Sequence, residues 1–312
     1  MKFNPKARFD TSQVRRRSSS ASGGGGFSTG GLSSGGRGMP GGMALPSGGI
    51  GLVLVIGFFL FTQFSGGSGP AAYDPDQVTG ADLTECDSGD DANNSQDCRI
   101  VGIVNSVQAF WTDALPDMTT AEYVESDTNL FSGSVRTDGC GVATSAVGPF
   151  YCPADDGVYI DTTFFEAMLE GELGAEGGDF AEAYVIAHEY GHHIQDILGT
   201  MDSVRGGAGE ESDSVRLELQ ADCYAGMWAK FATTVEDENG EVFILELTDE
   251  DIAEAIDAAE AVGDDRIQER VEGQVRPETW THGSAEDRRE WFMIGFERGT
   301  VDACDTFSVS DV

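Results

Sequence analysis

A cluster of histidines constrains this 312-residue chain more than any other sequence feature. Three of its four histidines lie in the run HEYGHH, residues 188–193. Apolar spacing predicts one helix over 179–198. Because His188 and His192 are four residues apart, one helical turn brings both imidazoles to the same face, where they can bind one metal ion. Glu189 lies beside that ion without being a ligand, as metal-assisted hydrolysis requires.

A solvated run on a surface helix is the alternative, since a match of this length arises by chance in about one of every hundred or more chains. The flanking residues argue against it. They make the helix apolar on nearly every side, and a buried helix does not carry two histidines and a glutamate without partners. These residues are Ala183, Val185, Ile186, Ala187, Ile194, Ile197 and Leu198.

A third protein ligand distinguishes the types of zinc hydrolase. The metzincin pattern would continue with Gly and His, but this chain has Gln195 and Leu198 at those positions. The alternative is a glutamate from a following helix, and the helix predicted over 212–233 provides Glu218. Asp222 lies one turn later on the same face, where it could accept a hydrogen bond from a ligating histidine and fix its tautomer.

The charge of the chain excludes nucleic-acid binding by the main domain. The net charge is −37, but residues 1–64 carry seven basic side chains and one acidic one. The remaining 248 residues carry 11 basic and 54 acidic side chains, a net charge of −43. Such a surface repels polyphosphates. The chain is 40% hydrophobic, which is enough for one large folded domain.

The N-terminal region predicts a tail and a membrane anchor. Residues 1–42 are basic and rich in Gly and Ser, which predicts a disordered cytoplasmic tail. An uncharged apolar stretch predicts a transmembrane helix over 43–65. A cleaved signal peptide is the alternative, but the preceding region is too long for one. The basic tail predicts a single-pass protein of the cell membrane with a cytoplasmic N-terminus and an extracytoplasmic catalytic domain. A linker and loop-rich segment over 66–97 leads to a domain over 98–312.

All six cysteines follow the predicted span, and an even number in an oxidising compartment indicates disulfides. Six cysteines allow fifteen pairings. We expect cysteines that are close in sequence to pair, and the remaining two to tie the C-terminus to the middle of the domain. The expected pairs are Cys86–Cys98, Cys140–Cys152 and Cys223–Cys304.

The remaining pattern predicts an α+β domain that is mainly helical with a small sheet. A short strand over 157–161 is a candidate edge on which an extended substrate could pair. The alternative is an ordinary strand with Val158 and Ile160 facing the core. Further helices are predicted over 100–115, from Thr248 to Gly263 and from Ser284 to Gly299, the last two opening with capping residues.

These motifs together resemble a known family. The segments HEYGHHIQD and ELQADCYAG, with FYCPADDGVYID before them and WTHGSAEDRREWFMIGFERG and CDTF after them, are similar to the putative neutral zinc metallopeptidase family of bacterial membrane-anchored proteins. The resemblance covers about residues 98–307 and implies a zincin fold of the thermolysin-like kind. It implies His188, His192 and Glu218 as zinc ligands, Glu189 as the base, and Asp222 as the residue that supports a ligand.

Peptide hydrolysis also needs a donor for the developing oxyanion. His282 is our candidate, because it is the only histidine outside the cluster. The alternative is a loop histidine that packs on Trp280 or caps the last helix. Tyr190 and Tyr224 are further candidates for the donor. His193 points about 100° away from the ligand face, so we expect it to be structural.

The sequence therefore predicts a membrane-anchored endopeptidase with one Zn²⁺ per chain and a polypeptide substrate, and it indicates no particular oligomeric state. Glu189 would take the proton of a zinc-activated water. The alternative is a non-catalytic, zinc-stabilised extracytoplasmic module that binds an envelope partner. A structural site normally closes its fourth ligand position and has no use for Glu189, which favours the enzyme. A calcium-binding adhesive domain is disfavoured, because the chain has no Asp-x-Asp-x-Asp-Gly loop.

Overall fold

The computed structural model describes residues 1–17 and 83–312, which form helices packed against a small sheet. The described helices are α2 (Gly89–Ala92), α3 (Gln96–Met118), α4 (Asp179–Ile197), α5 (Thr200–Ser203), α6 (Asp213–Phe231), α7 (Asp249–Ala261), α8 (Asp264–Glu272) and α9 (Ala285–Arg298). The described strands are β1 (Lys2–Phe3), β2 (Val14–Arg16), β3 (Asp127–Phe131), β4 (Ser134–Arg136), β5 (Val142–Thr144), β6 (Phe150–Cys152), β7 (Gly157–Asp161) and β8 (Ile244–Glu246). The α+β class predicted for the domain agrees with this architecture.

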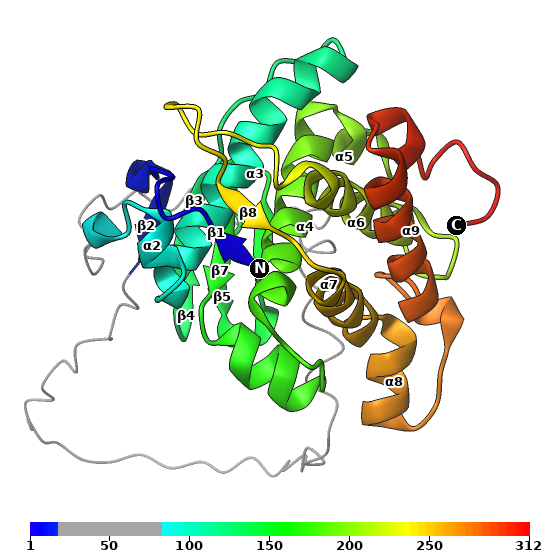
Figure 1. The fold of residues 1–312 in the computed structure, drawn as a ribbon. Helices are drawn as coiled ribbons and strands as arrows, with labels where there is room; N and C mark the ends of the chain where they lie inside the picture. Colours follow the sequence, from blue (N-terminus) through cyan, green and yellow to red (C-terminus); the bar gives the residue numbers. More distant parts are fainter. Residues whose placement is uncertain (18–82) are drawn as a thin grey trace, which may run out of the picture.

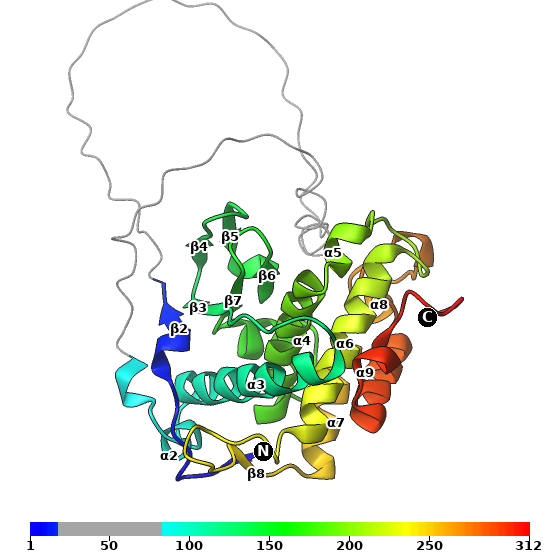
Figure 2. The same ribbon diagram turned by 90° about the horizontal axis from the view of Figure 1, so that it is seen from above.

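Helix α4 is the centre of the structure. It contacts α3, α6 and α7 as well as strands β6 and β7. Figures 1 and 2 show it between the sheet on one side and α6, followed by α9, on the other. Fifteen of its nineteen residues are buried, so its polar side chains need partners inside the protein.

The ends of α4 follow from its sequence. Asp179 and Glu182 lie in its first turn, where their charges favour the positive end of the helix dipole. At the other end Gly199 adopts a left-handed conformation with φ of 71°, which a residue with a side chain would resist. The helix predicted over 179–198 is confirmed.

Helices α6 and α9 touch through their backbones. A methyl group added at Gly226 of α6 would overlap the carbonyl oxygen of Phe292, and one added at Gly295 of α9 would overlap that of Cys223. The predicted helices that open at Thr248 and Ser284 are present as α7 and α9, each with a capping box at its N-terminus. The close packing therefore fixes α9, and the residues of its first turn, relative to α6.

The main sheet has the strand order β2-β3-β7-β6. Strands β2, β3 and β7 are parallel, and β6 pairs with β7 in the antiparallel direction. The strand predicted over 157–161 is confirmed as β7, but it is central and buried along its length. The prediction that it is an edge for substrate is therefore wrong, because β3 and β6 already occupy its hydrogen-bonding groups. The edge strand next to α4 is β6.

Residues 1–17 are part of the folded domain. Strand β1 pairs with β8, and β2 extends the main sheet beside β3. Phe3 is 1% exposed and packs edge-on against Phe9, which in turn stacks on Phe243. The predicted disordered tail is therefore wrong for residues 1–17, because the apolar side chains between the basic ones are buried. Residues 18–42 lie outside the described part.

The predicted transmembrane helix and single-pass membrane location need correction. Among residues 1–17 and 83–312, no helix is both long and apolar enough to cross a membrane. The segment 43–65 lies outside the described residues. A single crossing there would also put a membrane between residues 1–17 and the rest of the domain, whereas both contribute to one hydrophobic core. The predicted topology, with a cytoplasmic N-terminus and an extracytoplasmic domain, is therefore wrong.

The three disulfides of the structure join the expected pairs. They are Cys86–Cys98, Cys140–Cys152 and Cys223–Cys304. The described part of the segment predicted as linker and loops, 83–97, contains α2 and starts α3. The third disulfide holds the chain after α9 against α6, next to Asp222.

The N-terminal segment gives a prediction about stability. Replacing Phe3 by Ala should lower the free energy of unfolding by about 3–5 kcal/mol, because it leaves a cavity in a packed aromatic cluster. Urea unfolding of the full chain measures the change. The control is Leu245→Ala in β8, next to the partner of Phe3 but 49% exposed, which should change stability by about 0.5 kcal/mol or less. Equal effects of the two substitutions would show that residues 1–17 are not part of the core.

Candidate metal centre

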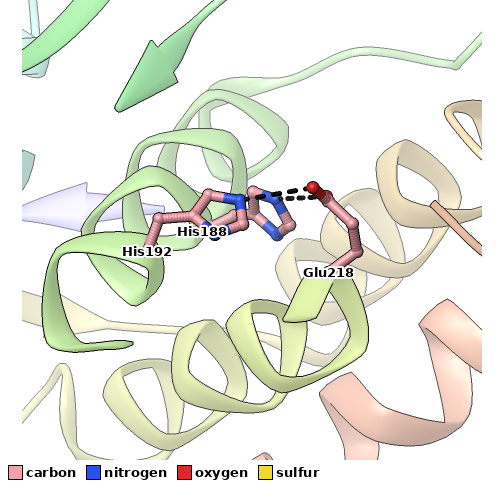
Figure 3. A group of neighbouring side chains, drawn as sticks. All are labelled: His188, His192 and Glu218. Atoms are coloured by element: carbon pink, nitrogen blue, oxygen red, sulfur yellow. Dashed lines mark ion pairs between the residues drawn. The ribbon is translucent and has the colours of Figure 1, made fainter. Parts of the chain in front are cut away.

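Helices α4 and α6 bring the predicted ligands His188, His192 and Glu218 together. Their ligand atoms all lie within 4.8 Å of one another. The Nε2 atom of His188 lies 3.2 Å from Oε2 of Glu218, and Nε2 of His192 lies 3.6 Å from Oε1. Figure 3 shows both imidazoles directed at the carboxylate from the neighbouring helix. Two donors bound tetrahedrally at about 2.0–2.2 Å from one ion lie about 3.3–3.6 Å apart, so the spacing fits zinc.

The far side of each imidazole is held by a hydrogen bond. His188 Nδ1 donates to Oδ1 of the buried Asp222 at 2.8 Å, as the sequence predicted for a supporting residue. His192 Nδ1 donates to Oε1 of Gln195 at 2.9 Å. The amide of Gln195 is itself oriented, since its Nε2 donates to the Leu217 carbonyl at 2.6 Å. With protons on both Nδ1 atoms, the lone pairs of both Nε2 atoms face Glu218, where a metal would sit.

The buried charges around this cluster fit a divalent cation. Glu189, Glu218 and Asp222 are buried carboxylates, and Arg288 is a buried guanidinium between them and α9. With neutral histidines these groups sum to a charge of −2. Burying an unbalanced charge is costly, so a site with this composition favours an ion of charge +2. The donor set of two imidazoles and one carboxylate is typical of zinc hydrolases.

The electrostatics of the two glutamates differ. Burial would raise the pKa of Glu218, but the neighbouring His192 and His282 outweigh burial and hold it well below its usual range. Burial raises the pKa of Glu189, and the nearby histidines only partly offset that. The nearby backbone N–H of Tyr151 in β6 lowers the pKa of Glu189 by a smaller amount. Glu218 therefore suits the role of an anionic ligand, and Glu189 that of a group that takes up a proton.

A cavity of about 130 Å³ opens onto this cluster. It is lined by the three candidate ligands, Glu189, His282 and Arg288 on one side. Strand β6 and the turn before it contribute another wall. The apolar lining comes from Val147, Pro149, Phe150, Phe164, Val185, Met201 and Val262. The cavity therefore combines a polar floor with mostly apolar walls, as ligand sites commonly do.

The structure brings His282 to this cavity although it lies about ninety residues beyond the cluster. Its Nδ1 faces Asp264 Oδ1 at 3.3 Å, and its backbone N–H donates to the same carboxylate. Burial lowers the pKa of His282, but Asp264 outweighs burial and raises it above the usual value. Its Nε2 is buried and has no hydrogen-bond partner among residues 1–17 and 83–312. His282 therefore lines the cavity with one ring nitrogen held by Asp264 and the other unpartnered among the described residues.

The other predicted candidates have structural contacts. Tyr190 shares a hydrogen bond of 2.7 Å with Thr128 in the sheet, and Tyr224 packs edge-on against Trp111. His193 donates from Nε2 to the Val124 carbonyl at 2.7 Å. None of these three side chains lines the cavity. The expectation that His193 is structural agrees with its contacts.

Sequence reasoning missed Gln195, Tyr151 and Arg288. Gln195 follows His192 by three residues, so helical periodicity alone could have placed it beside that imidazole. Tyr151 contributes a backbone N–H, which carries no side-chain signal. Arg288 lies in the capping-box turn of α9, 66 residues after the carboxylate that it pairs with, so no local spacing indicates the contact.

The sequence is similar to proteins of a known family. The family described as putative neutral zinc metallopeptidase matches residues 1–307. Uncharacterized protein Rv2575 of Mycobacterium tuberculosis is 51% identical over 235 residues, which cover 75% of this chain and 78% of that protein. Uncharacterized protein YpfJ of Escherichia coli is 37% identical over 297 residues, which cover 89% of this chain and 94% of that protein. No solved structure matches significantly, so the thermolysin-like fold stays a prediction.

The crossing of α4 and α6 gives a prediction at Gly191. A methyl group there would lie 2.9 Å from both Cα and the carbonyl oxygen of Ala221, so the helices would have to move apart. Helix propensity alone would make Gly191→Ala stabilising by about 1 kcal/mol. We expect the clash to dominate and to lower the free energy of unfolding by about 1–3 kcal/mol. Urea unfolding of the metal-free wild type and of Gly191→Ala measures the difference. A variant that is more stable than wild type would contradict the close crossing of α4 and α6.

Proposed function

Because this chain belongs to the putative neutral zinc metallopeptidase family, we propose that it is a zinc-dependent endopeptidase whose metal is held by His188, His192 and Glu218. One observation carries the assignment of ligands. The donor atoms of these residues lie within 4.8 Å of one another, while both far imidazole nitrogens are occupied by hydrogen bonds. Three protein ligands leave a fourth position open to the cavity.

Glu189 is the proposed general base. Zinc, when bound, supplies a Lewis acid that polarises the peptide carbonyl and makes a water molecule acidic. The Glu189 carboxylate faces the same cavity, where it takes the proton of the attacking water and later passes it to the departing amine. Its raised pKa favours holding that proton between the two steps.

His282 is the proposed donor to the oxyanion that forms on the attacked carbonyl. Asp264 holds the Nδ1 side of its ring and favours the protonated form, so Nε2–H can donate into the cavity. Its buried Nε2 has no other partner among the described residues. A preorganised donor of this kind stabilises the transition state more than the substrate.

The walls of the cavity favour a polypeptide with an apolar side chain next to the cleaved bond. The lining away from the metal is apolar, and the one guanidinium in it is already paired with Asp222. Strand β6, the last strand of the described sheet on this side, forms one wall of the cavity. Apart from the proposed ligands and catalytic groups, the charged side chain in the lining is Arg288, which is paired with Asp222, so no further charge is provided for a substrate terminus, which favours an endopeptidase.

Two neighbouring histidines test the metal assignment. Purified wild-type protein should contain one zinc per chain, and His192→Ala should lose it, because a ligand is removed. His193→Ala is the matched control: its ring donates to the Val124 carbonyl, so that variant should keep zinc although it loses stability. Elemental analysis of both variants measures the metal. Loss of zinc from both, or from neither, would contradict the ligand set.

Glu189→Gln tests the chemistry. The amide keeps the size of the side chain but cannot accept a proton, so hydrolysis of a quenched peptide library should fall by about 10²–10⁴-fold while zinc stays bound. The library should also show preferential cleavage beside apolar residues. A variant that retains zinc and full activity would exclude Glu189 as the base. Wild-type protein that binds zinc but cleaves no member of the library would instead favour the non-catalytic, zinc-stabilised module.

A further inference from the structure

Arg288 is the most completely buried cation at the candidate metal centre, with 3% of its surface exposed. Its Nε donates to Oδ2 of Asp222 at 2.8 Å, and its Nη2 donates to Oδ1 at 3.0 Å. Nη2 also donates to the Tyr184 hydroxyl at 3.1 Å, and Nη1 reaches the Val262 carbonyl at 3.4 Å. Four of the five N–H groups of the guanidinium therefore have partners inside the protein.

The same carboxylate supports the first proposed ligand. Oδ1 of Asp222 accepts from His188 Nδ1 at 2.8 Å and from the Tyr184 hydroxyl at 2.6 Å. Both oxygens of Asp222 thus have defined partners, and the two-point contact with Arg288 fixes the plane of the carboxylate. Rotation of that plane would move Oδ1 away from His188 and release the imidazole to turn.

We propose that Arg288 is a positioning residue for the metal: it holds Asp222 in the orientation that aims His188 Nε2 at the ion. The inference rests on the proposed function only in taking His188 as a ligand. Arg288 does not contact the candidate ligand atoms, although it lines the cavity and its Nη2 lies 3.5 Å from Nδ1 of His188. Because Arg288 acts through Asp222, its removal should weaken metal binding more than it weakens substrate binding.

The fold places this guanidinium firmly. Arg288 lies in the first turn of α9, directly after the capping box of Ser284 and Asp287. The backbone contact at Gly226 and Gly295 holds α9 against the helix that carries Asp222. A lysine at this position would bring one charge but could not make the two parallel hydrogen bonds. Arg288→Lys therefore separates the effect of the positive charge from that of the two hydrogen bonds to Asp222.

Three variants of the full chain test the proposal. Arg288→Met removes the charge and both donors, Arg288→Lys keeps the charge, and Arg289→Met makes the same change at the next residue. Arg289 is an apt control because its side chain is 56% exposed and its contact with Glu260 is long, at 3.9 Å. Zinc affinity is measured by competition between the metal-free protein and a chelator. Binding of Co²⁺ adds an absorption spectrum that reports the geometry of the ligands.

We expect Arg288→Met to weaken zinc binding by about 10–100-fold, as removal of an outer hydrogen-bond partner typically does. Arg288→Lys should fall between that variant and wild type, with a changed Co²⁺ spectrum. Arg289→Met should stay within about 2-fold of wild type, as expected for a weak surface pair. With zinc saturating, Arg288→Met should lower kcat more than it raises KM, because most of the guanidinium's hydrogen bonds go to the protein and position Asp222.

The outcomes separate this proposal from the proposed function. Wild-type protein that binds no zinc would overturn the metal assignment itself. Wild-type protein that binds zinc, together with Arg288→Met of equal affinity and an unchanged Co²⁺ spectrum, would overturn only the role of Arg288. Should Arg288→Met fail to fold, Arg288→Lys decides in its place, and wild-type affinity in that variant would overturn the proposal.

Asp222→Asn completes the test. If Arg288 acts through Asp222, the double variant Asp222→Asn, Arg288→Met should bind zinc no more weakly than Asp222→Asn alone. Fully additive losses would mean that Arg288 affects the metal by another route and would overturn the proposed relay.

Discussion

The close crossing of α4 and α6 is the constraint on which the candidate site depends. Gly191 lies between the two histidines of one helix, and Ala221 lies between the two carboxylates of the other. Because the helices meet at these small residues, side chains one turn apart on each helix face one another across the contact. A glycine in mid-helix costs about 1 kcal/mol relative to alanine, and here that cost permits the approach. The geometry of the three candidate ligands is therefore a property of helix packing, since all three lie on α4 and α6.

Charge is distributed differently inside and outside the protein. The chain has 18 basic and 55 acidic residues, so its surface carries a large negative excess. The buried site does not share that excess: Arg288 balances one carboxylate, the pair of Asp264 and His282 balances itself, and a divalent ion would balance the rest. Buried charges without such balance would destabilise the fold by several kcal/mol each. An arginine placed in the interior of so acidic a chain is thus a specific requirement of the site.

Short-range patterns predicted the parts of the site that lie on single helices, and long-range packing decided the rest. His188, His192 and Glu218 could be proposed because a helix fixes which residues share a face. The edge position of β6, by contrast, depends on strand order, which no local pattern encodes. The Gly- and Ser-rich, basic composition of residues 1–42 predicts a disordered tail, although Phe3 and Phe9 give an apolar pattern between the basic residues, and both are buried. A prediction from composition alone misses these two core residues. The predicted membrane topology is wrong for the same reason, because it treats residues 1–17 as separate from the domain.

The packing around α4 and α6 also indicates how much the folding of the site would depend on zinc. Away from the ligands, Phe180 of α4 stacks on Trp228 of α6 at 5.8 Å between ring centroids, and a disulfide holds Cys223 to the chain after α9. These contacts fix both helices without any participation of the metal ligands. A site built on such a frame is largely formed before the ion binds, unlike small domains that fold only around their zinc. Binding energy is then not consumed in ordering the chain, and the outer hydrogen bonds from Asp222 and Gln195 can tune affinity and orientation.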